Sequence, residues 1–132
     1  MDPRFVEERY PFQSHLDFEL TGWREGFARF EQPVVDYLGN RHGNLHGGVH
    51  ATLLDTAMGY AGCWTGDPGR RQMALTLSLT VNYTGRSEGM RLIAEARRTG
   101  GGRRTFFAEG EVRDEAGVLL ATGSGVFRYR DG

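Results

Sequence analysis

One short stretch of the sequence combines a glycine pair with a carboxylate that follows soon afterwards. In GNRHGNLHGGVHATLLDTAMGY, Gly47 and Gly48 stand where a helix-like run begins, and Asp55 lies inside that run among apolar residues. Backbone N–H groups at a helix N-terminus have no partner within the helix, so they can bind a developing negative charge, as in an oxyanion hole. A carboxylate on a mostly apolar helix is costly unless it is paired or exposed. We interpret Asp55 either as a solvated side chain or as a partly desolvated general base or nucleophile.

The spacing of these groups limits how they can act together. Gly47 and Asp55 are eight residues apart in the sequence. A helix converts eight residues into roughly 12 Å, so one small reacting centre cannot touch both groups. If both serve one reaction, the second group must come from another subunit. A two-fold dimer with antiparallel helices would bring Gly47 of one chain toward Asp55 of the other.

Three histidines in the same stretch raise the alternative of a metal site. His42, His46 and His50 are spaced four residues apart. Ligands at that spacing need a continuous helix to point the same way, and the glycines before residue 48 make such a helix unfavourable. The helical HExxH zinc pattern is also absent. We therefore expect no metal and no cofactor, with each histidine capping a helix or packing in the core.

Composition points to an ordinary globular protein with a single domain over residues 1–132. The net charge of −1 gives no preference for nucleic acid or for an anionic membrane. The arginines crowd the region from Arg86 to Arg130, which suits either phosphate binding or solvated strand edges. The single cysteine, Cys63, excludes a disulfide framework within the chain. With no apolar signal segment or membrane-length apolar run, we expect a cytoplasmic protein that binds neither nucleic acid nor membranes.

The hydrophobic pattern predicts one long helix among several strands. The helix-like run covers residues 48–64, where apolar residues recur every three or four positions. An N-terminal helical segment is expected within residues 1–15, and the glycine-rich residues 36–47 form a loop. Short connections predict antiparallel neighbours in an α+β fold whose helix covers one face of a curved sheet. The expected strands are 16–23 and 25–34, joined by a turn near Gly22, followed by 72–84, 90–99, 103–114 and 118–130.

Two motifs resemble those of a known family. The pattern Asn-x-x-Gly-x-Leu-His-Gly-Gly-x6-Asp is similar to that of hotdog-fold acyl-CoA thioesterases of the phenylacetate-pathway (thioesterase superfamily-2) type. The later TLSLTVNYTGR resembles the strand that follows the helix in that family, and the element order agrees from about residue 10 to 130. The first motif occupies Asn40, Gly43, Leu45, His46, Gly47, Gly48 and Asp55.

The resemblance implies a hotdog fold, in which a curved antiparallel sheet of about six strands wraps one long central helix. It implies dimers whose sheets join edge to edge and which pair again into tetramers. It also implies hydrolysis of acyl-CoA thioesters to a free acid and coenzyme A, at sites shared across the dimer interface. Aryl-acyl and medium-chain acyl groups remain open as substrates, as does the choice between dimer and tetramer.

Carried over by position, the resemblance also implies roles for individual residues. The Gly47 N–H would polarise the thioester carbonyl, and Asp55 of the facing subunit would be the base or nucleophile. Asn40 and His46 would order the loop, with Asn40 near the carbonyl or the attacking water. Thr76 would orient the water or the carboxylate.

The substrate would be bound at Gly48 and, through the coenzyme A phosphates, at Arg86, Arg103 and Arg104. Two other functions compete with hydrolysis. A hotdog hydratase or dehydratase resembles a different pattern, with a His before a Pro-Gly-rich stretch or an Asp-x4-His pair, and is disfavoured because the turn here is His-Gly-Gly without proline. A non-catalytic acyl-CoA-binding module is disfavoured because Asp55, Asn40 and Thr76 all match the catalytic pattern.

Overall fold

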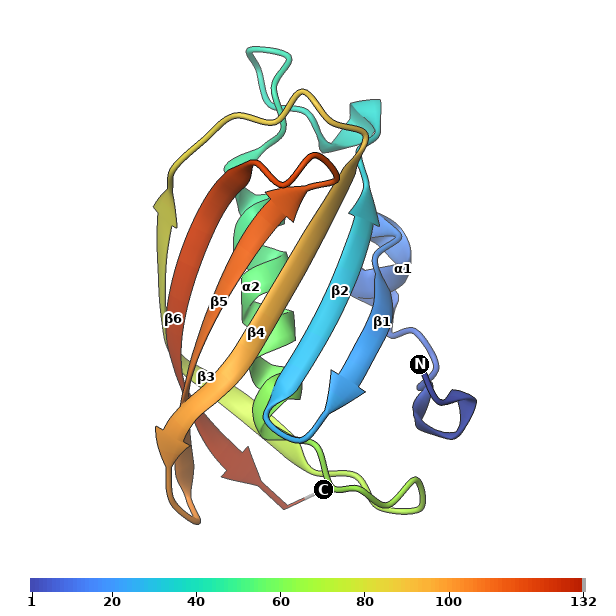
Figure 1. Ribbon diagram of the computed structural model, residues 1–132, viewed down its shortest axis with the longest axis vertical. Coiled ribbons are helices and arrows are strands. Elements are labelled where there is room, and N and C mark those ends of the chain that lie inside the picture. Colours follow the sequence, from blue (N-terminus) through green and yellow to red (C-terminus); the bar gives the residue numbers. More distant parts are fainter. Residues whose placement is uncertain (132) are drawn as a thin grey trace.

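A curved sheet of six antiparallel strands wraps one long helix in the computed structural model, which describes residues 1–131 (Figure 1). This arrangement confirms the predicted α+β hotdog fold. Within the described residues, no helix has the length and apolar character needed to cross a membrane. The elements are η1 (Pro3–Phe5), α1 (Pro11–Leu16), β1 (Glu19–Arg24), β2 (Phe27–Pro33), η2 (Asp36–Leu38), α2 (Gly47–Gly62), β3 (Met73–Tyr83), β4 (Arg91–Gly101), β5 (Thr105–Asp114) and β6 (Leu119–Arg130).

The strand order shows that one predicted pairing is wrong. The order is β1-β2-β4-β5-β6-β3, so β3 and β4 are not neighbours although a short connection joins them. Three spacings between strands amount to roughly 14 Å. The connection over residues 84–90 crosses that width at the end of the sheet, because an extended segment of that length reaches more than about 20 Å. β3 therefore lies at an edge, paired only with β6.

Two predictions near the N-terminus are also corrected. The helical segment expected within residues 1–15 is divided into η1 and α1. Pro11 favours an extended backbone at Tyr10, which has φ −83° and ψ 164°, so the helix begins only after that residue. The turn between β1 and β2 lies at residues 25–26 rather than near Gly22. Gly26 supplies the positive φ of 68° that this turn requires, whereas Gly22 lies within β1 beside a register shift.

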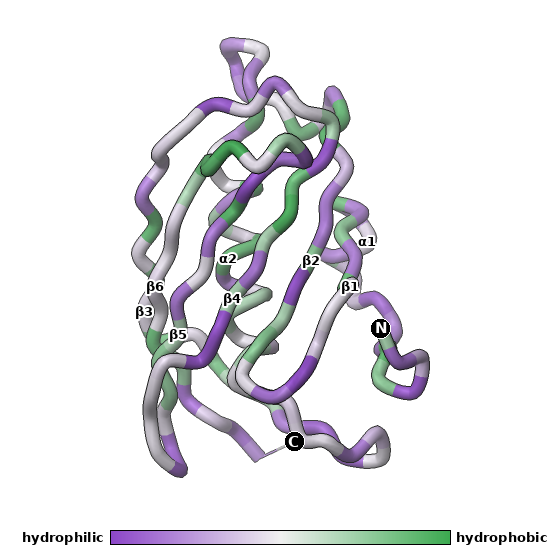
Figure 2. Tube along the Cα trace, viewed as in Figure 1, coloured by the Kyte–Doolittle hydropathy of each residue, from purple (hydrophilic) through white to green (hydrophobic). Residues whose placement is uncertain are grey.

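The core lies between α2 and the concave face of the sheet. The helix residues that face the sheet, such as Leu54 and Met58, are fully buried. Glycines on β6 let the helix approach closely, since an added Cβ would lie 3.1 Å from Leu54 at Gly123 and 3.3 Å from Met58 at Gly125. Figure 2 shows hydrophobic residues along α2 and the central strands, with hydrophilic residues common in the end loops.

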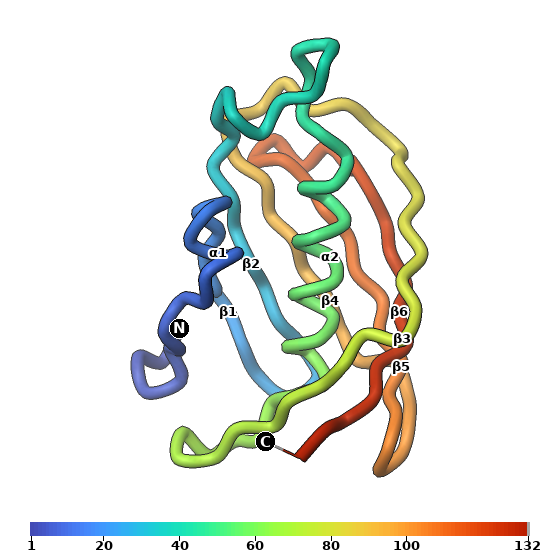
Figure 3. The backbone as a smooth tube through the Cα atoms, turned by 180° about the vertical axis from the view of Figure 1, so that it is seen from behind, coloured from blue at the N-terminus to red at the C-terminus, as the bar shows by residue number. Residues whose placement is uncertain are grey.

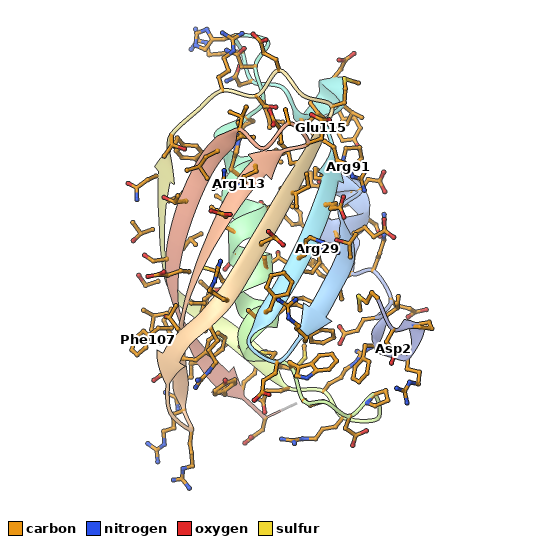
Figure 4. The ribbon with its side chains drawn as sticks, viewed as in Figure 1. Asp2, Arg29, Arg91, Phe107, Arg113 and Glu115 are labelled. Carbon is orange, nitrogen blue, oxygen red and sulfur yellow. The ribbon has the colours of Figure 1, made fainter. Side chains whose placement is uncertain are left out.

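The outer face of the sheet, which points away from α2, carries paired charges. Arg91 donates to Glu31 at 2.8 Å, and Arg113 donates to Glu111 at 3.0 Å. Each of these bonds lowers the pKa of its carboxyl group. Figure 4 shows Arg29, Arg91 and Arg113 on this face. Arg91 and Arg113 are therefore balanced by neighbouring carboxylates.

The opposite side of α2 is not covered by the sheet. Figure 3 shows this side, with the N-terminal segment along one flank and β3 along the other. The residues that point outward here are either small or short and polar. Each of them is partly or fully exposed, and none belongs to the buried core. This outward face of α2 consists of Gly48, Ala51, Thr52, Asp55, Thr56 and Gly59.

Candidate active site

The N-terminus of α2 offers one unused backbone donor. His46 is the N-cap residue, and its Nδ1 accepts a hydrogen bond of 2.8 Å from the Gly48 N–H. A Cβ at Gly48 would lie 2.9 Å from that nitrogen, so the cap requires glycine there. Among residues 1–131, the Gly47 N–H has no hydrogen-bond acceptor. Substrate was expected at Gly48, but the N–H of this residue is used by the helix cap. The Gly47 N–H is the donor that remains for an incoming oxygen.

The loop before α2 is organised around Asn40. Its Oδ1 accepts hydrogen bonds from the backbone N–H groups of His42 at 2.9 Å and Asn44 at 3.1 Å. The His46 N–H, at the end of the loop, donates to the Leu38 carbonyl at 2.8 Å. Because Oδ1 is used within the loop, the amide nitrogen of Asn40 is the part of this side chain that remains as a donor.

Asp55 lies half-buried in the outward face of α2 and is held by β3. The Thr76 hydroxyl donates to Asp55 Oδ1 at 2.7 Å. On the other flank, the Tyr10 hydroxyl is hydrogen-bonded to Thr56 Oγ1 at 3.2 Å. Burial raises the pKa of the Tyr10 phenol, and the Asp55 charge acts in the same direction. The carboxylate thus lies between β3 and the N-terminal segment and faces away from the core.

Gly47 and Asp55 form two half-sites within one chain. Both belong to α2, and the eight intervening residues correspond to roughly 12 Å along the helix. The chain therefore does not bring the donor and the carboxylate together, as their spacing predicts.

Tyr83 contacts the Gly47 half-site and was missed by the sequence analysis. Its hydroxyl donates to the Gly47 carbonyl at 2.5 Å. Its ring is close to the same glycine, since a Cβ at Gly47 would lie 3.1 Å from the phenol carbon. The His50 ring packs edge-on against Tyr83, at 5.5 Å between centroids. The Asn-Tyr pair near the end of the predicted strand 72–84 is part of the second motif and could have drawn attention to Tyr83. Its contact with Gly47 could not be predicted, because nothing in the sequence links the two residues.

The three histidines diverge in the structure. His42 is exposed in the loop, His46 caps α2, and His50 is only 6% exposed. Burial lowers the pKa of His50. Across residues 1–131, no group of three His, Cys, Asp or Glu side chains is placed to hold a metal ion.

The three arginines proposed for phosphate do not form one cluster. Arg86 precedes β4, and Arg103 and Arg104 follow it. The eleven residues of β4 correspond to roughly 35 Å. Figure 1 accordingly shows the β3–β4 connection and the β4–β5 hairpin at opposite ends of the molecule. Arg103 instead borders a surface hollow of about 270 Å³ together with Trp64 and Arg70. One chain therefore offers two separate basic positions.

Comparisons with known proteins agree with the fold. A sequence model of the thioesterase superfamily matches residues 42–121, which is more than half of the chain and includes α2 with both half-sites. No match was found among curated protein sequences. A conserved protein of Pseudomonas aeruginosa is 26% identical with a TM-score of 0.83, and 98% of each chain is covered.

Two further solved structures carry descriptive names. A thioesterase family protein of Silicibacter pomeroyi is 25% identical with a TM-score of 0.81, over 93% of this chain and 91% of that one. The phenylacetic acid degradation protein PaaI of Thermus thermophilus, solved as a mutant, is 27% identical with a TM-score of 0.77, over 90% of this chain and 98% of that one. The similarity extends over nearly the whole length of these proteins.

Proposed function

The chain belongs to the thioesterase superfamily, and we propose that it hydrolyses acyl-CoA thioesters to a free acid and coenzyme A. The observation that carries this proposal is the placement of Asp55. Its carboxylate is half-buried on the outward face of α2 and is held by Thr76 at 2.7 Å. Hydrolysis of a thioester needs such a base and a donor for the carbonyl oxygen, and the Gly47 N–H supplies the donor.

The complete site requires two chains. The small residues on the outward face of α2 permit close approach of a second helix. The edge strand β3 also exposes Met73, Leu75 and Leu77, whose exposed fractions are 47%, 48% and 57%. An unpaired edge with exposed apolar side chains is a template for pairing with another chain. We propose a two-fold dimer in which β3 pairs with β3 and the α2 helices run antiparallel, so that Gly47 of each chain approaches Asp55 of the other.

The proposed reaction starts with water at Asp55. The carboxylate accepts a proton as the water oxygen bonds to the thioester carbonyl carbon, and the carbonyl π electrons move onto the oxygen. The N–H of Gly47 of the partner subunit donates to that oxyanion. Collapse of the intermediate re-forms the carbonyl and breaks the C–S bond, and the thiolate takes the proton from Asp55. Thr76 keeps the carboxylate aimed at the water.

Substrate binding follows from the same arrangement. The acyl group lies along the outward faces of the two helices, which accommodate an aryl or medium-chain group. The phosphates of coenzyme A are placed against Arg86 or against Arg103 and Arg104. Because these positions lie at opposite ends of β4, a given chain offers one of them, and not both, to a single coenzyme A.

Free-thiol release from a panel of aryl- and acyl-CoA thioesters tests this function. Asp55→Asn should lower kcat by about 10²–10⁴-fold, the usual contribution of a general base, without changing folding or oligomer size. Full activity in Asp55→Asn would refute the mechanism. A parent protein that binds acyl-CoA but hydrolyses none of the panel would instead be a binding module. An acyl-enzyme anhydride at Asp55, trapped by quenching and found by mass spectrometry, would identify the carboxylate as nucleophile rather than base.

The shared site has its own test. Asp55→Asn and Gly47→Pro chains, each inactive alone, are co-expressed with different tags, and the hybrid dimers are purified over both tags. Each hybrid has one intact pairing of Gly47 with Asp55, so about half of the parental activity should return. Hybrids without activity, or a fully active monomer, would exclude the shared site.

A further inference from the structure

Two hydroxyl groups of β3 hold α2 at its two half-sites. Thr76 donates to Asp55 at 2.7 Å, and Tyr83 donates to the Gly47 carbonyl at 2.5 Å. We propose that Tyr83 is a positioning residue for the Gly47 N–H, so that β3 aligns both reacting groups of α2. This inference rests on the proposed function, because it gives a role to the Gly47 donor that hydrolysis requires.

Tyr83 and His46 act on the same peptide group. The carbonyl of Gly47 and the N–H of Gly48 belong to the peptide unit that joins these two residues. Tyr83 binds its oxygen, and the His46 ring binds its N–H at 2.8 Å. A glycine pair has little conformational preference of its own, so these two bonds add to the first turn of α2 in setting the backbone at Gly47. The adjacent Gly47 N–H then keeps one direction while its acceptor site stays open.

The Tyr83 ring is itself held in place. Its ring touches Gly47, and on the other side it meets the His50 ring at an interplanar angle of 85°. His50 is 6% exposed, so it provides a fixed surface. The backbone of Tyr83 pairs with Ala121 on β6, and the pairing continues through the Thr84 N–H, which donates to the Leu120 carbonyl at 2.9 Å. The phenol therefore reaches Gly47 from a rigid base.

A bulge in β3 makes this double contact possible. Thr76 and Tyr83 are seven residues apart, so regular alternation would place them on opposite faces of the sheet. The register shifts between Thr76 and Ser78, where two steps on β3 oppose one step on β6. The extra residue, Leu77, restores both hydroxyls to the face that packs against α2. Consistent with this, Thr76 lies opposite Phe127 and Tyr83 opposite Ala121, both of which are buried under the helix.

In the proposed dimer, the two hydroxyls of one chain serve different sites. Thr76 aligns the carboxylate of one site, and Tyr83 aligns the donor of the other, since Gly47 works with Asp55 of the partner subunit. Tyr83 thus serves the site that contains Asp55 of the partner subunit, whereas Thr76 serves the site that contains Asp55 of its own chain. A residue with a purely structural role would not show this distinction.

The matched comparison is between Tyr83→Phe and Tyr129→Phe. Tyr129 donates to the Gly62 carbonyl at 2.7 Å, so each variant removes one tyrosine hydroxyl from a glycine carbonyl of the same helix. We expect Tyr83→Phe to lower kcat about tenfold with KM within about twofold, as loss of one hydrogen bond implies. Tyr129→Phe should stay within about twofold of the parent in both. Equal kcat values in the two variants would overturn the inference.

Hybrid dimers distinguish a positioning role of Tyr83 at one site from a general destabilisation of the dimer. In a hybrid of Asp55→Asn with Tyr83→Phe chains, the only site with an acid has an unaltered Tyr83 beside its Gly47. That site should turn over at the parental rate, whereas a hybrid of Asp55→Asn with Thr76→Val should retain the Thr76→Val defect. If this hybrid instead shows the Tyr83→Phe defect, Tyr83 serves the site that contains Asp55 of its own chain, which would contradict the proposal.

Two measurements distinguish the positioning role of Tyr83 from the proposed hydrolytic mechanism: amide NMR of the tyrosine variants and the activity of Asp55→Asn. The Gly47 and Gly48 amide signals should shift in Tyr83→Phe and stay in place in Tyr129→Phe, whatever the substrate. Unmoved signals would refute the positioning role even if the enzyme is active. Conversely, full hydrolysis by Asp55→Asn would refute the proposed mechanism while leaving the amide result to decide whether Tyr83 sets the backbone at Gly47.

Discussion

The two ends of α2 use the same interaction for different purposes. At each end a tyrosine from a strand of the sheet donates to a glycine carbonyl, Tyr83 of β3 to Gly47 and Tyr129 of β6 to Gly62. At the C-terminal end the glycine is pressed into the core, because an added Cβ would lie 2.1 Å from the Phe106 ring. At the N-terminal end the neighbour is Tyr83, which is 54% exposed, and the glycine N–H lacks an acceptor within residues 1–131.

Under the proposed function, this difference separates a glycine needed for stability from a glycine needed for chemistry. Gly62 closes the space between α2 and β5, so any added atom there strains the core. Gly47 leaves space and a donor on the side where the second chain is proposed to lie. A glycine can thus be required at both ends of one helix, at one end because of what fills the space and at the other because of what must enter it.

Among the changes that test this comparison of the two helix ends, the largest effect is expected from removing the donor at the N-terminal end. Gly47→Pro deletes the N–H at a helix position that tolerates proline, and His46 already has the extended φ of −65° and ψ of 131° that precede proline. We expect kcat to fall by about 10²–10³-fold with the fold retained, as for loss of one oxyanion donor. Steady-state kinetics and circular dichroism measure both.

Gly47→Ala is the control for that change. It adds a similar Cβ, 3.1 Å from the Tyr83 ring, but retains the N–H. The difference in kcat between the two variants isolates the donor. If they lose the same activity, the effect comes from crowding of Tyr83 rather than from the missing N–H.

At the C-terminal end, the corresponding change should affect stability rather than chemistry. Gly62→Ala forces a methyl group into the Phe106 ring, and overpacking of this kind costs about 1–3 kcal/mol of unfolding free energy. Chemical denaturation should show this loss, whereas kcat per folded protein should stay at the parental value. A Gly62→Ala protein that is as stable as Gly47→Ala would show that the two ends are equally tolerant, against the comparison made above.

A smaller fall in kcat is expected when Thr76, which holds the Asp55 carboxylate, is replaced. Thr76→Val keeps the side-chain volume but removes the bond of 2.7 Å to Asp55. A hydrogen bond to a charged group contributes roughly 1.5–3 kcal/mol, so kcat should fall about tenfold or more. Thr80→Val, on the same strand but on its outer face, is the matched control and should keep parental kinetics. Identical kinetics in both variants would remove Thr76 from the site.

The smallest expected effect concerns how the stability of the protein depends on pH through His50, the residue that packs against Tyr83. Burial lowers the pKa of His50 in the folded protein, so the unfolded chain binds the proton first as pH falls. Stability should therefore decrease as pH drops below the unfolded value of about 6.5 and continue to fall until the lower folded pKa is passed. Melting temperatures of the parent and His50→Phe, measured between about pH 5 and 8, should show a shallower decline in the variant.

His42→Gln is the control for that series. His42 is exposed in the loop before α2, so its replacement should leave the slope with pH unchanged. If His50→Phe retains the parental slope, other titrating groups are responsible for it.

Local patterns were sufficient to predict much of the fold and part of the candidate site. The long helix was predicted within two residues at each end, because the spacing of residues such as Leu53, Ala57 and Ala61 repeats with the helical period. The bounds of the strands were also close, since turn residues separate them. The partnership of β3 with β6 was missed because strand order depends on contacts between distant segments, which periodicity does not encode.

The sequence by itself determined the distance between Gly47 and Asp55, because both lie in one helix whose rise per residue is constant. It thereby predicted two half-sites and a second chain to unite them. Only the tertiary structure decided which residues hold these half-sites. Regular alternation along β3 would place Thr76 and Tyr83 on opposite faces, and the bulge at Leu77 places both against α2. That bulge depends on pairing with β6, more than forty residues away along the chain, and so it is a property of the folded sheet rather than of the strand.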